Sequence, residues 1–242
     1  MWIDIKKYKH YDLLQEVTKV HLEEYAEWKE KYWYEDRMQV TKYHHPEVYP
    51  ELAKINVKID FDNDTDAYHR PENIPDRPNP NENWYCDGIH SAGNRGPAWD
   101  DWKRSAELSF KLPGVTQHIV NFIRPHTTLR DHDDFGGWER NATDLNMPTL
   151  NGFTMSLGLD TLPDKKDQGI MMWNPFADIQ QWKGCGTGDW CCFEGKTHFH
   201  HVYNKSDQWR VTCIIDIEES HFDLNEEERE YLNNRWATYK RT

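Results

Sequence analysis

The sequence lacks any run of apolar residues long enough to cross a bilayer, which takes about 20 residues in a helix. Basic residues are in the minority, since 29 Lys and Arg stand against 42 Asp and Glu and the formal net charge is −13. Nucleic acids and anionic membranes are bound by basic surfaces, so neither is expected as the main partner. Residues 1–7 lack the basic-then-apolar order of a signal peptide, and we therefore expect a cytoplasmic protein.

Cysteine pairs of the CxxC type are missing as well. The five cysteines are odd in number and scattered, which disfavours both a disulfide framework and a zinc site made of cysteines. We expect them to act as small apolar side chains. Aromatic residues, in contrast, make up 14% of the chain and include 12 Trp, a content that argues against disorder because such rings need a buried environment.

Helical patterns occur at both ends of the chain. Residues 1–50 are expected to be mainly helical, because apolar side chains recur at spacings of three and four: Leu14, Val17, His21, Tyr25, Trp28 and Tyr32. From Leu224 the tail is expected to return to helix, with Asn225 as its N-cap and glutamates in its first turn. The Asp-, Asn- and Pro-rich stretch between residues 60 and 83 is expected to be a loop.

The middle of the chain has the pattern of short strands separated by turns. The expected strands are Val115–Arg124, Phe153–Leu159, Gly169–Trp173, Trp190–Phe193, His198–Tyr203 and Trp209–Ile217. Short strands at this density predict an all-β sandwich or barrel. We expect one structural domain in three parts: helices and loops packed on the core in residues 1–110, the β core in 111–220, and a C-terminal helix in 221–242.

Residues 129–135, with the sequence LRDHDDF, carry the strongest local signal for chemistry. His132 and Asp134 are two positions apart, so in an extended segment they project to the same face. One imidazole from the later stretch His198–Tyr203 would complete a set of two histidines and one carboxylate. Such a facial triad leaves open positions on non-haem Fe(II) for O₂ and a cosubstrate. The motif alone is weak, because HxD arises by chance in a chain with 13 His and 42 acidic residues, and a surface histidine beside solvated acids is the alternative.

Arg210 adds a third element to this pattern. It begins a strand-like stretch and shares its parity with Thr212, which would direct both side chains into the barrel. A buried arginine is unfavourable unless it is paired with an anion, and its planar fork suits a carboxylate. A dicarboxylate cosubstrate that binds iron at one end would need such a clamp at the other.

With these motifs in place, the chain resembles the Fe(II)- and 2-oxoglutarate-dependent oxygenases. The resemblance covers roughly residues 115–218 and is greatest to the aspartyl/asparaginyl β-hydroxylase branch, which includes free-proline hydroxylases. The matching segments are Phe122–Pro125, Leu129–Phe135, Met155–Leu159, Gly188–Trp190, His200–Arg210 and Ile214–Ile217. The resemblance implies a mainly β fold with flanking helices, built on a double-stranded β-helix, the jelly roll that cupins also have.

Carried over residue by residue, the resemblance implies that His132, Asp134 and His200 hold Fe(II) and that Arg210 binds the distal carboxylate of 2-oxoglutarate. The implied enzyme is a dioxygenase that consumes O₂ and hydroxylates an unactivated C–H bond, with release of succinate and CO₂. Its partner would be a small-molecule or peptide substrate, namely an amino acid or an Asp-, Asn- or Pro-like side chain. The oligomeric state stays open.

Two cosubstrate positions depart from the family pattern. Asn121 falls where the family often has a serine that contacts the cosubstrate, and Ser156 falls where aspartyl hydroxylases have a histidine. Each keeps a group that forms hydrogen bonds, so both are expected to bind 2-oxoglutarate.

The second iron histidine is chosen among three neighbours. The spacing to Arg210 and the following valine favour His200. His198 shares its face, so it would either line the substrate site or simply pack, whereas His201 would point away.

The connection that follows the first iron strand, residues 136–152, is longer than this branch usually shows. Its glycine pair, followed by Trp138 and Arg140, is typical of a lid that selects substrate, and a surface insertion is the alternative.

Two other classes of function remain open. One is a cupin-like metal-binding isomerase or binding protein without oxidative activity, and the other is a metal-free interaction module. Arg210 discriminates against the cupin, because a cupin has no need of a carboxylate clamp ten residues after its last metal ligand.

Overall fold

The computed structural model describes residues 1–32, 40–44, 102–123, 125, 127–132, 151–164, 166–174 and 179–238. The helices are α1 (Tyr11–Tyr32), α2 (Lys103–Ser109) and α3 (Glu226–Thr238). The strands are β1 (Trp2–Ile3), β2 (Val40–His44), β3 (Val115–Ile123), β4 (Thr127–His132), β5 (Gly152–Asp160), β6 (Gln168–Asn174), β7 (Ile179–Lys183), β8 (Trp190–Phe193), β9 (Phe199–Asn204) and β10 (Arg210–Glu218). The stretch between residues 60 and 83 lies outside the described residues.

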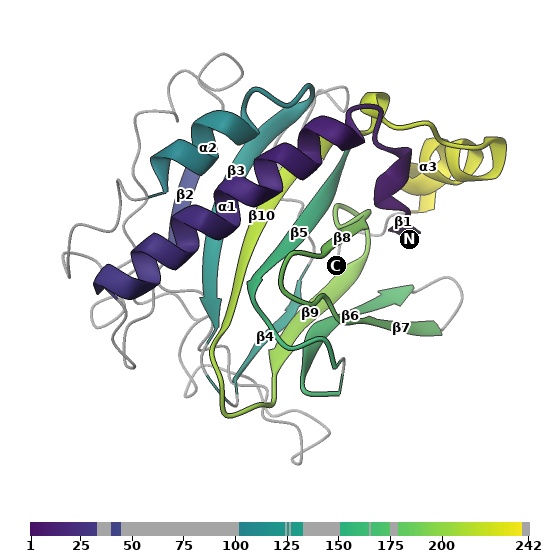
Figure 1. Ribbon diagram of the computed structural model, residues 1–242. Helices are drawn as coiled ribbons and strands as arrows, with labels where there is room; N and C mark the ends of the chain where they lie inside the picture. Colours follow the sequence, from purple (N-terminus) through teal and green to yellow (C-terminus); the bar gives the residue numbers. More distant parts are fainter. Residues whose placement is uncertain are drawn as a thin grey trace.

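The strands form two antiparallel sheets (Figure 1). The six-stranded sheet has the order β1-β8-β5-β10-β3-β2, and the four-stranded sheet has the order β4-β9-β6-β7. The eight consecutive strands β3 to β10 supply four neighbouring strands to each sheet. This connectivity is that of a double-stranded β-helix, or jelly roll. The expected fold class, mainly β with flanking helices, is therefore confirmed.

Strand β10 shows how the large sheet divides its side chains between two faces. Val211, Cys213 and Ile215 belong to the apolar core that the sheet shares with α1. Arg210 and the alternate residues after it lie on the inner face of the sheet, toward the small sheet. The ladder partner of Arg210 is Ile123, and Ile123 packs in a second apolar cluster between the sheets. The other members of this cluster are Ile170, Met172, Phe193 and Val202.

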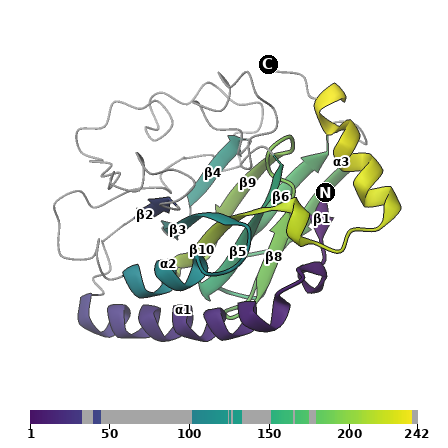
Figure 2. The same ribbon diagram turned by 90° about the horizontal axis from the view of Figure 1, so that it is seen from above.

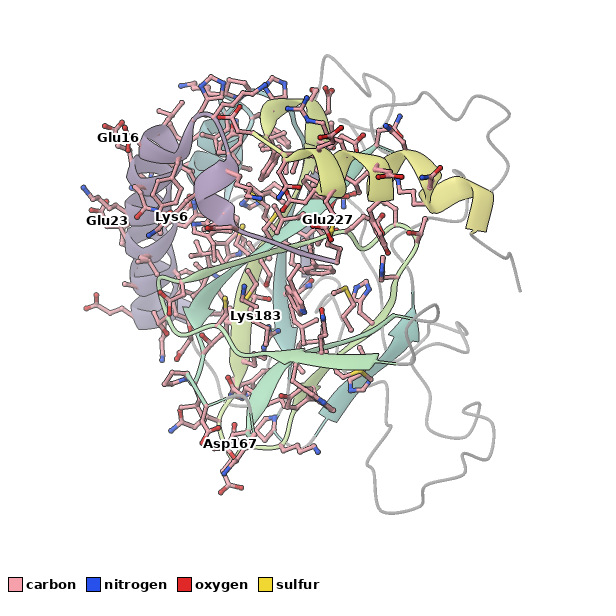
Figure 3. The ribbon with its side chains drawn as sticks, turned by 90° about the vertical axis from the view of Figure 1, so that its right-hand side faces the viewer. Lys6, Glu16, Glu23, Asp167, Lys183 and Glu227 are labelled. Atoms are coloured by element: carbon pink, nitrogen blue, oxygen red, sulfur yellow. The ribbon has the colours of Figure 1, made fainter. Side chains whose placement is uncertain are left out.

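Helices α1 and α2 cover the outer face of the large sheet, with the small sheet on the other side (Figure 2). The described part of the predicted stripe, Leu14 to Trp28, is buried, which confirms that this face of α1 packs inward. Glu16 and Glu23 point away from the sheet on the opposite face of the helix (Figure 3). The rings of Trp28 and Trp102, which precedes α2, have their centroids 5.5 Å apart and join the two helices.

The C-terminal helix α3 begins as the sequence predicts. The Asn225 side chain accepts a hydrogen bond from the Glu228 backbone N–H at 2.9 Å, and the Glu228 carboxylate accepts one from the Asn225 N–H at 2.9 Å. This reciprocal arrangement is a capping box, and it satisfies two backbone donors that would otherwise lack partners at the start of the helix.

The expectation that residues 1–50 are mainly helical is wrong at Val40–His44, which form the edge strand β2. Five consecutive residues of β2 pair with β3, so the hydrogen bonds of the ladder decide the conformation there rather than local propensity. The strands β1 and β7 were not expected either, and α2 was not singled out as a helix. All three elements are too short to carry a strong periodic signal.

Candidate active site

The first strong feature of the inner face is the burial of Arg210 at the start of β10. Arg210 is only 3% exposed, and its ladder partner on β3 is the apolar Ile123. The parity argument from the sequence placed Arg210 and Thr212 on one face of a strand, and the register agrees with it.

The guanidinium of Arg210 has no carboxylate beside it within the described part of the chain. Burial lowers its pKa, and the groups that act in the opposite direction are Cys185, Cys191 and Tyr203. A buried guanidinium without an anionic partner is unfavourable, because its charge has lost most of its contact with water. The arrangement is therefore that of a site for an anion.

Two further polar atoms on this face lack hydrogen-bond partners. Thr212 Oγ1 and Asn121 Oδ1 are buried and make no hydrogen bond within the described structure. The two residues are direct partners across the β10–β3 ladder. Buried polar groups are nearly always paired, so two neighbouring unpaired groups beside a buried cation mark a place where a polar ligand fits. Ser156 on β5 is 2% exposed and pairs with Ile214, which lies two residues after Thr212 on β10.

His200 comes from the small sheet, which faces these residues. It is 3% exposed, and its ring packs against that of Phe193 in the inner apolar cluster, with centroids 5.0 Å apart. His200 Nδ1 lies 3.1 Å from the backbone oxygen of His198. A carbonyl oxygen only accepts, so Nδ1 carries the proton and the lone pair is on Nε2, the nitrogen that a metal would bind.

The backbone of β4 brings His132 next to His200. The two residues are direct Cα partners in the β4–β9 ladder, and a register irregularity lies between Leu129 and His132. These two histidines come from segments about seventy residues apart in the sequence, and the β4–β9 ladder places their backbones side by side. Asp134, Trp138 and Arg140 lie outside the described residues, so their roles remain predictions.

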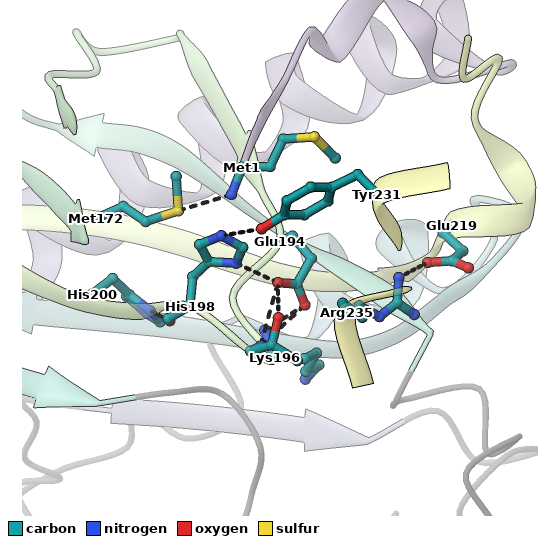
Figure 4. Close-up of polar contacts among 10 residues, drawn as sticks. Met1, Met172, Glu194, Lys196, His198, His200, Glu219, Tyr231 and Arg235 are labelled. Carbon is teal, nitrogen blue, oxygen red and sulfur yellow. Dashed lines mark hydrogen bonds and ion pairs between the residues drawn. The ribbon is translucent and has the colours of Figure 1, made fainter. Parts of the chain in front are cut away.

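His198 occupies a buried chain of hydrogen bonds (Figure 4). Its Nδ1 donates to Glu194 Oε2 at 2.6 Å, and its Nε2 lies 2.6 Å from the hydroxyl of Tyr231 on α3. Burial alone would raise the pKa of Glu194, but hydrogen bonds from His198 and Thr197 hold that pKa below its usual value. These contacts hold the His198 ring in place, and its role at a substrate site stays a prediction.

The contacts of His198 also orient His200, the candidate metal ligand. Glu194 and Tyr231 fix the ring of His198, and the backbone oxygen of His198 accepts a hydrogen bond from His200. Sequence reasoning did not find Glu194 or Tyr231. The spacing of four between Glu194 and His198 was the available signal for the first, and nothing in the sequence pointed to the second.

His201 lies on the other face of β9, as expected. Its ring and that of Tyr203 pack against Trp182, with centroids 5.6 Å and 5.1 Å away, and Trp182 is 40% exposed. This leaves His200 as the histidine of β9 whose ring belongs to the inner face.

A pair of thiols stands near the guanidinium. Cys185 forms a side-chain hydrogen bond with Cys191, which lowers the pKa of Cys191, and Lys183 and Arg210 act in the same direction while burial opposes them. Cys191 is the ladder partner of Ser156, so its side chain belongs to the same inner face.

None of the described helices combines the length and apolar composition needed to cross a membrane.

No protein-family model matches the sequence, and no curated protein matches it. Solved structures that resemble parts of the fold include a Pseudomonas putida prolyl-4-hydroxylase, with a TM-score of 0.34, 15% identity and coverage of 50% of this chain and 60% of that one. An oxidoreductase of the 2OG-Fe(II) oxygenase family from Burkholderia pseudomallei has a TM-score of 0.34 and 12% identity, over 43% of this chain and 42% of that one. A cupin domain from Bordetella pertussis has a TM-score of 0.27 and 11% identity, over 44% of this chain and 83% of that one.

The match thus spans less than two thirds of either oxygenase. Two of these structures are oxygenases and one is a cupin domain, and an aspartyl/asparaginyl β-hydroxylase is not among the three.

Proposed function

We propose that the protein is an Fe(II)- and 2-oxoglutarate-dependent dioxygenase that hydroxylates an unactivated C–H bond of an amino acid or of a peptidyl side chain of the Asp, Asn or Pro kind. The observation that carries the proposal is the state of Arg210, which is 3% exposed and has no acidic partner in the described structure. Such a guanidinium is explained by a ligand that brings its own carboxylate.

The residues around Arg210 fit one end of 2-oxoglutarate. The distal carboxylate would accept two hydrogen bonds from the guanidinium fork, and the Thr212 hydroxyl would donate a third. Asn121, whose Oδ1 lacks a partner, offers an amide on the neighbouring strand, and Ser156 offers a hydroxyl. A carboxylate bound there would pair the buried charge and accept a hydrogen bond from the Thr212 hydroxyl at the same time.

His132, Asp134 and His200 would hold the metal, in line with the family resemblance. When bound, Fe(II) would supply the redox chemistry that couples oxidative decarboxylation of 2-oxoglutarate to hydroxylation, with one oxygen atom of O₂ in succinate and the other in the product. The protein positions His200 through its Nδ1–H bond to the His198 backbone. The Phe193 ring beside His200 keeps water from that side of the imidazole.

The rival function is a cupin-like metal protein without oxidative activity. It shares the fold and the pair of histidines, and it leaves the charge of Arg210 unexplained. The two functions differ in one measurement, because only the oxygenase converts 2-oxoglutarate to succinate.

The test is succinate formation by the full chain with Fe(II), ascorbate and 2-oxoglutarate, prepared anaerobically and started by admitting air. Screening free amino acids and a peptide library for compounds that stimulate succinate release identifies the substrate. We expect slow release without substrate and faster release with it. Iron bound at one per chain with no succinate from any mixture would support the cupin, and no bound iron would support the metal-free module.

A further inference from the structure

A second group of metal-binding side chains lies on the outer face of the large sheet. His21 on α1, His118 on β3 and Cys213 on β10 come together beneath the helical layer. All three are buried, at 1%, 0% and 0% exposure, and their ligand atoms lie within 4.8 Å of one another. From the sequence, His21 was expected in the buried stripe of a helix and Cys213 as a small apolar side chain, and no local sequence pattern joins the three residues.

The hydrogen bonds of His21 show which of its nitrogens carries the lone pair. Its Nδ1 lies 2.8 Å from the backbone oxygen of Val17, so Nδ1 donates and the lone pair is on Nε2. That Nε2 lies 3.2 Å from His118 Nε2 and 3.1 Å from Ser109 Oγ. Burial lowers the pKa of His21 to about 4, which keeps the ring neutral at physiological pH. Burial and the neighbouring His21 lower the pKa of His118 as well.

These separations have the size of a tetrahedral zinc site. With Zn–N bonds of about 2.0–2.1 Å, two ligand atoms at corners of a tetrahedron are about 3.3 Å apart. The observed distance of 3.2 Å between the two imidazole nitrogens matches it, and Ser109 Oγ lies 3.1 Å from the same nitrogen of His21. Imidazole and thiolate together favour zinc over the hard cations, which prefer oxygen ligands.

The charge of such a site would be balanced by a neighbouring acid. Cys213 would lose its proton on binding, so two neutral imidazoles and one thiolate leave a single positive charge on the complex. Glu24, one turn after His21 on α1, is 5% exposed and lies near enough to act on the Cys213 thiol. Its carboxylate is held by the backbone N–H groups of Arg104 and Ser105, at 3.1 Å and 2.9 Å.

We propose that His21, His118 and Cys213 bind a structural zinc ion that fastens helix α1 to the central strands of the large sheet. The site is separate from the proposed iron site. Cys213 and Thr212 are adjacent on β10, so their side chains lie on opposite faces of the sheet. The zinc proposal therefore stands or fails independently of the proposed oxygenase activity.

The experiment measures metal content in protein purified without chelators from zinc-supplemented cells. We expect about one zinc per chain by mass spectrometry of the metal. We expect Cys213→Ala to reduce that content by about ten-fold or more. The matched control is Cys192→Ala, which removes another buried thiol from the same core without touching the cluster. His200→Ala, in the proposed iron site, should also keep its zinc.

A second measurement needs no variant. Replacing the metal with Co²⁺ in the wild-type chain should give the near-ultraviolet absorption of a cobalt–thiolate bond and the visible bands of tetrahedral cobalt. Wild-type protein without stoichiometric zinc and without the thiolate band would overturn the proposal, and the cluster would then be a hydrogen-bonded part of the core. Zinc retained in full by a folded Cys213→Ala chain would overturn it as well.

Discussion

Replacing Arg210 with methionine should separate ligand binding from stability, because the two effects have opposite signs. Methionine keeps most of the apolar stem and removes the buried charge. Since the guanidinium has no acidic partner among the described residues, we expect the free protein to be as stable as the wild type or more stable. Replacing even a paired buried charge and its partner with apolar residues of similar volume is often neutral or gains about 1–4 kcal/mol.

With 2-oxoglutarate bound, we expect the wild type to become the more stable of the two proteins. At 100 times its dissociation constant, 2-oxoglutarate stabilises a protein that binds it by about 2.7 kcal/mol. For a chain of this size 1 kcal/mol shifts Tm by about 2–4 °C, so the wild type should gain about 5–11 °C. Thermal unfolding with anaerobic Fe(II) measures both effects, and Arg210→Met should show little or no gain from 2-oxoglutarate. A 2-oxo acid without the distal carboxylate should stabilise neither protein by this route.

A second buried arginine among the described residues provides a matched control. Arg235 is 3% exposed, like Arg210, but its guanidinium donates to Glu219 at 2.6 Å and to Asn151 at 2.7 Å. Arg235→Met should therefore lose about 1–3 kcal/mol of stability and keep its response to 2-oxoglutarate. An Arg210→Met protein that is less stable than the wild type and still gains fully from 2-oxoglutarate would refute the assignment of Arg210.

Four further predictions test other parts of the structure. His200→Ala should abolish iron-dependent succinate formation while the unfolding midpoint changes little; full activity would move the metal ligand elsewhere. Tyr231→Phe should lower stability by about 1 kcal/mol in urea, because it removes the hydroxyl 2.6 Å from His198 Nε2, and an unchanged midpoint would contradict that bond. Gly158→Ala should lower the free energy of unfolding by about 1–3 kcal/mol, since the new Cβ would lie 2.4 Å from the backbone oxygen of Gly186; a neutral effect would show that the backbone at Gly186 moves freely. Trp138→Ala should impair substrate hydroxylation far more than the slow decay of 2-oxoglutarate without substrate, whereas equal losses would place Trp138 in the core.

The sequence predicts the strands of the jelly roll well because both faces of its large sheet are covered. Met155 to Leu159 and Val211 to Ile217 form β-rich runs that no helical period fits, and both stretches are buried strands. The inward direction of Arg210 follows from the same alternation. Strand β2 could not be predicted, because its conformation depends on pairing with β3, a segment about seventy residues away.

The contacts that orient the candidate site are harder to find. Residues 194 to 198 read as a turn before a histidine-rich strand, and only the structure shows Tyr231 of α3 joining them. The cluster of His21, His118 and Cys213 combines three elements whose residues are nearly one hundred positions apart in each step. Such groups are set by packing, and one sequence carries no local mark of them.

The irregularity in β4 has a consequence for how this protein tolerates change. Leu129 pairs with Val202 and His132 with His200, so three steps along β4 match two along β9. One extra residue therefore sets the phase of the strand, as in a β-bulge. Deleting a single residue between Leu129 and His132 would remove this bulge, and with it the local bend of the strand beside His132. Inserting one would add a second unmatched residue, so we expect a library of length variants to tolerate almost no change in this stretch.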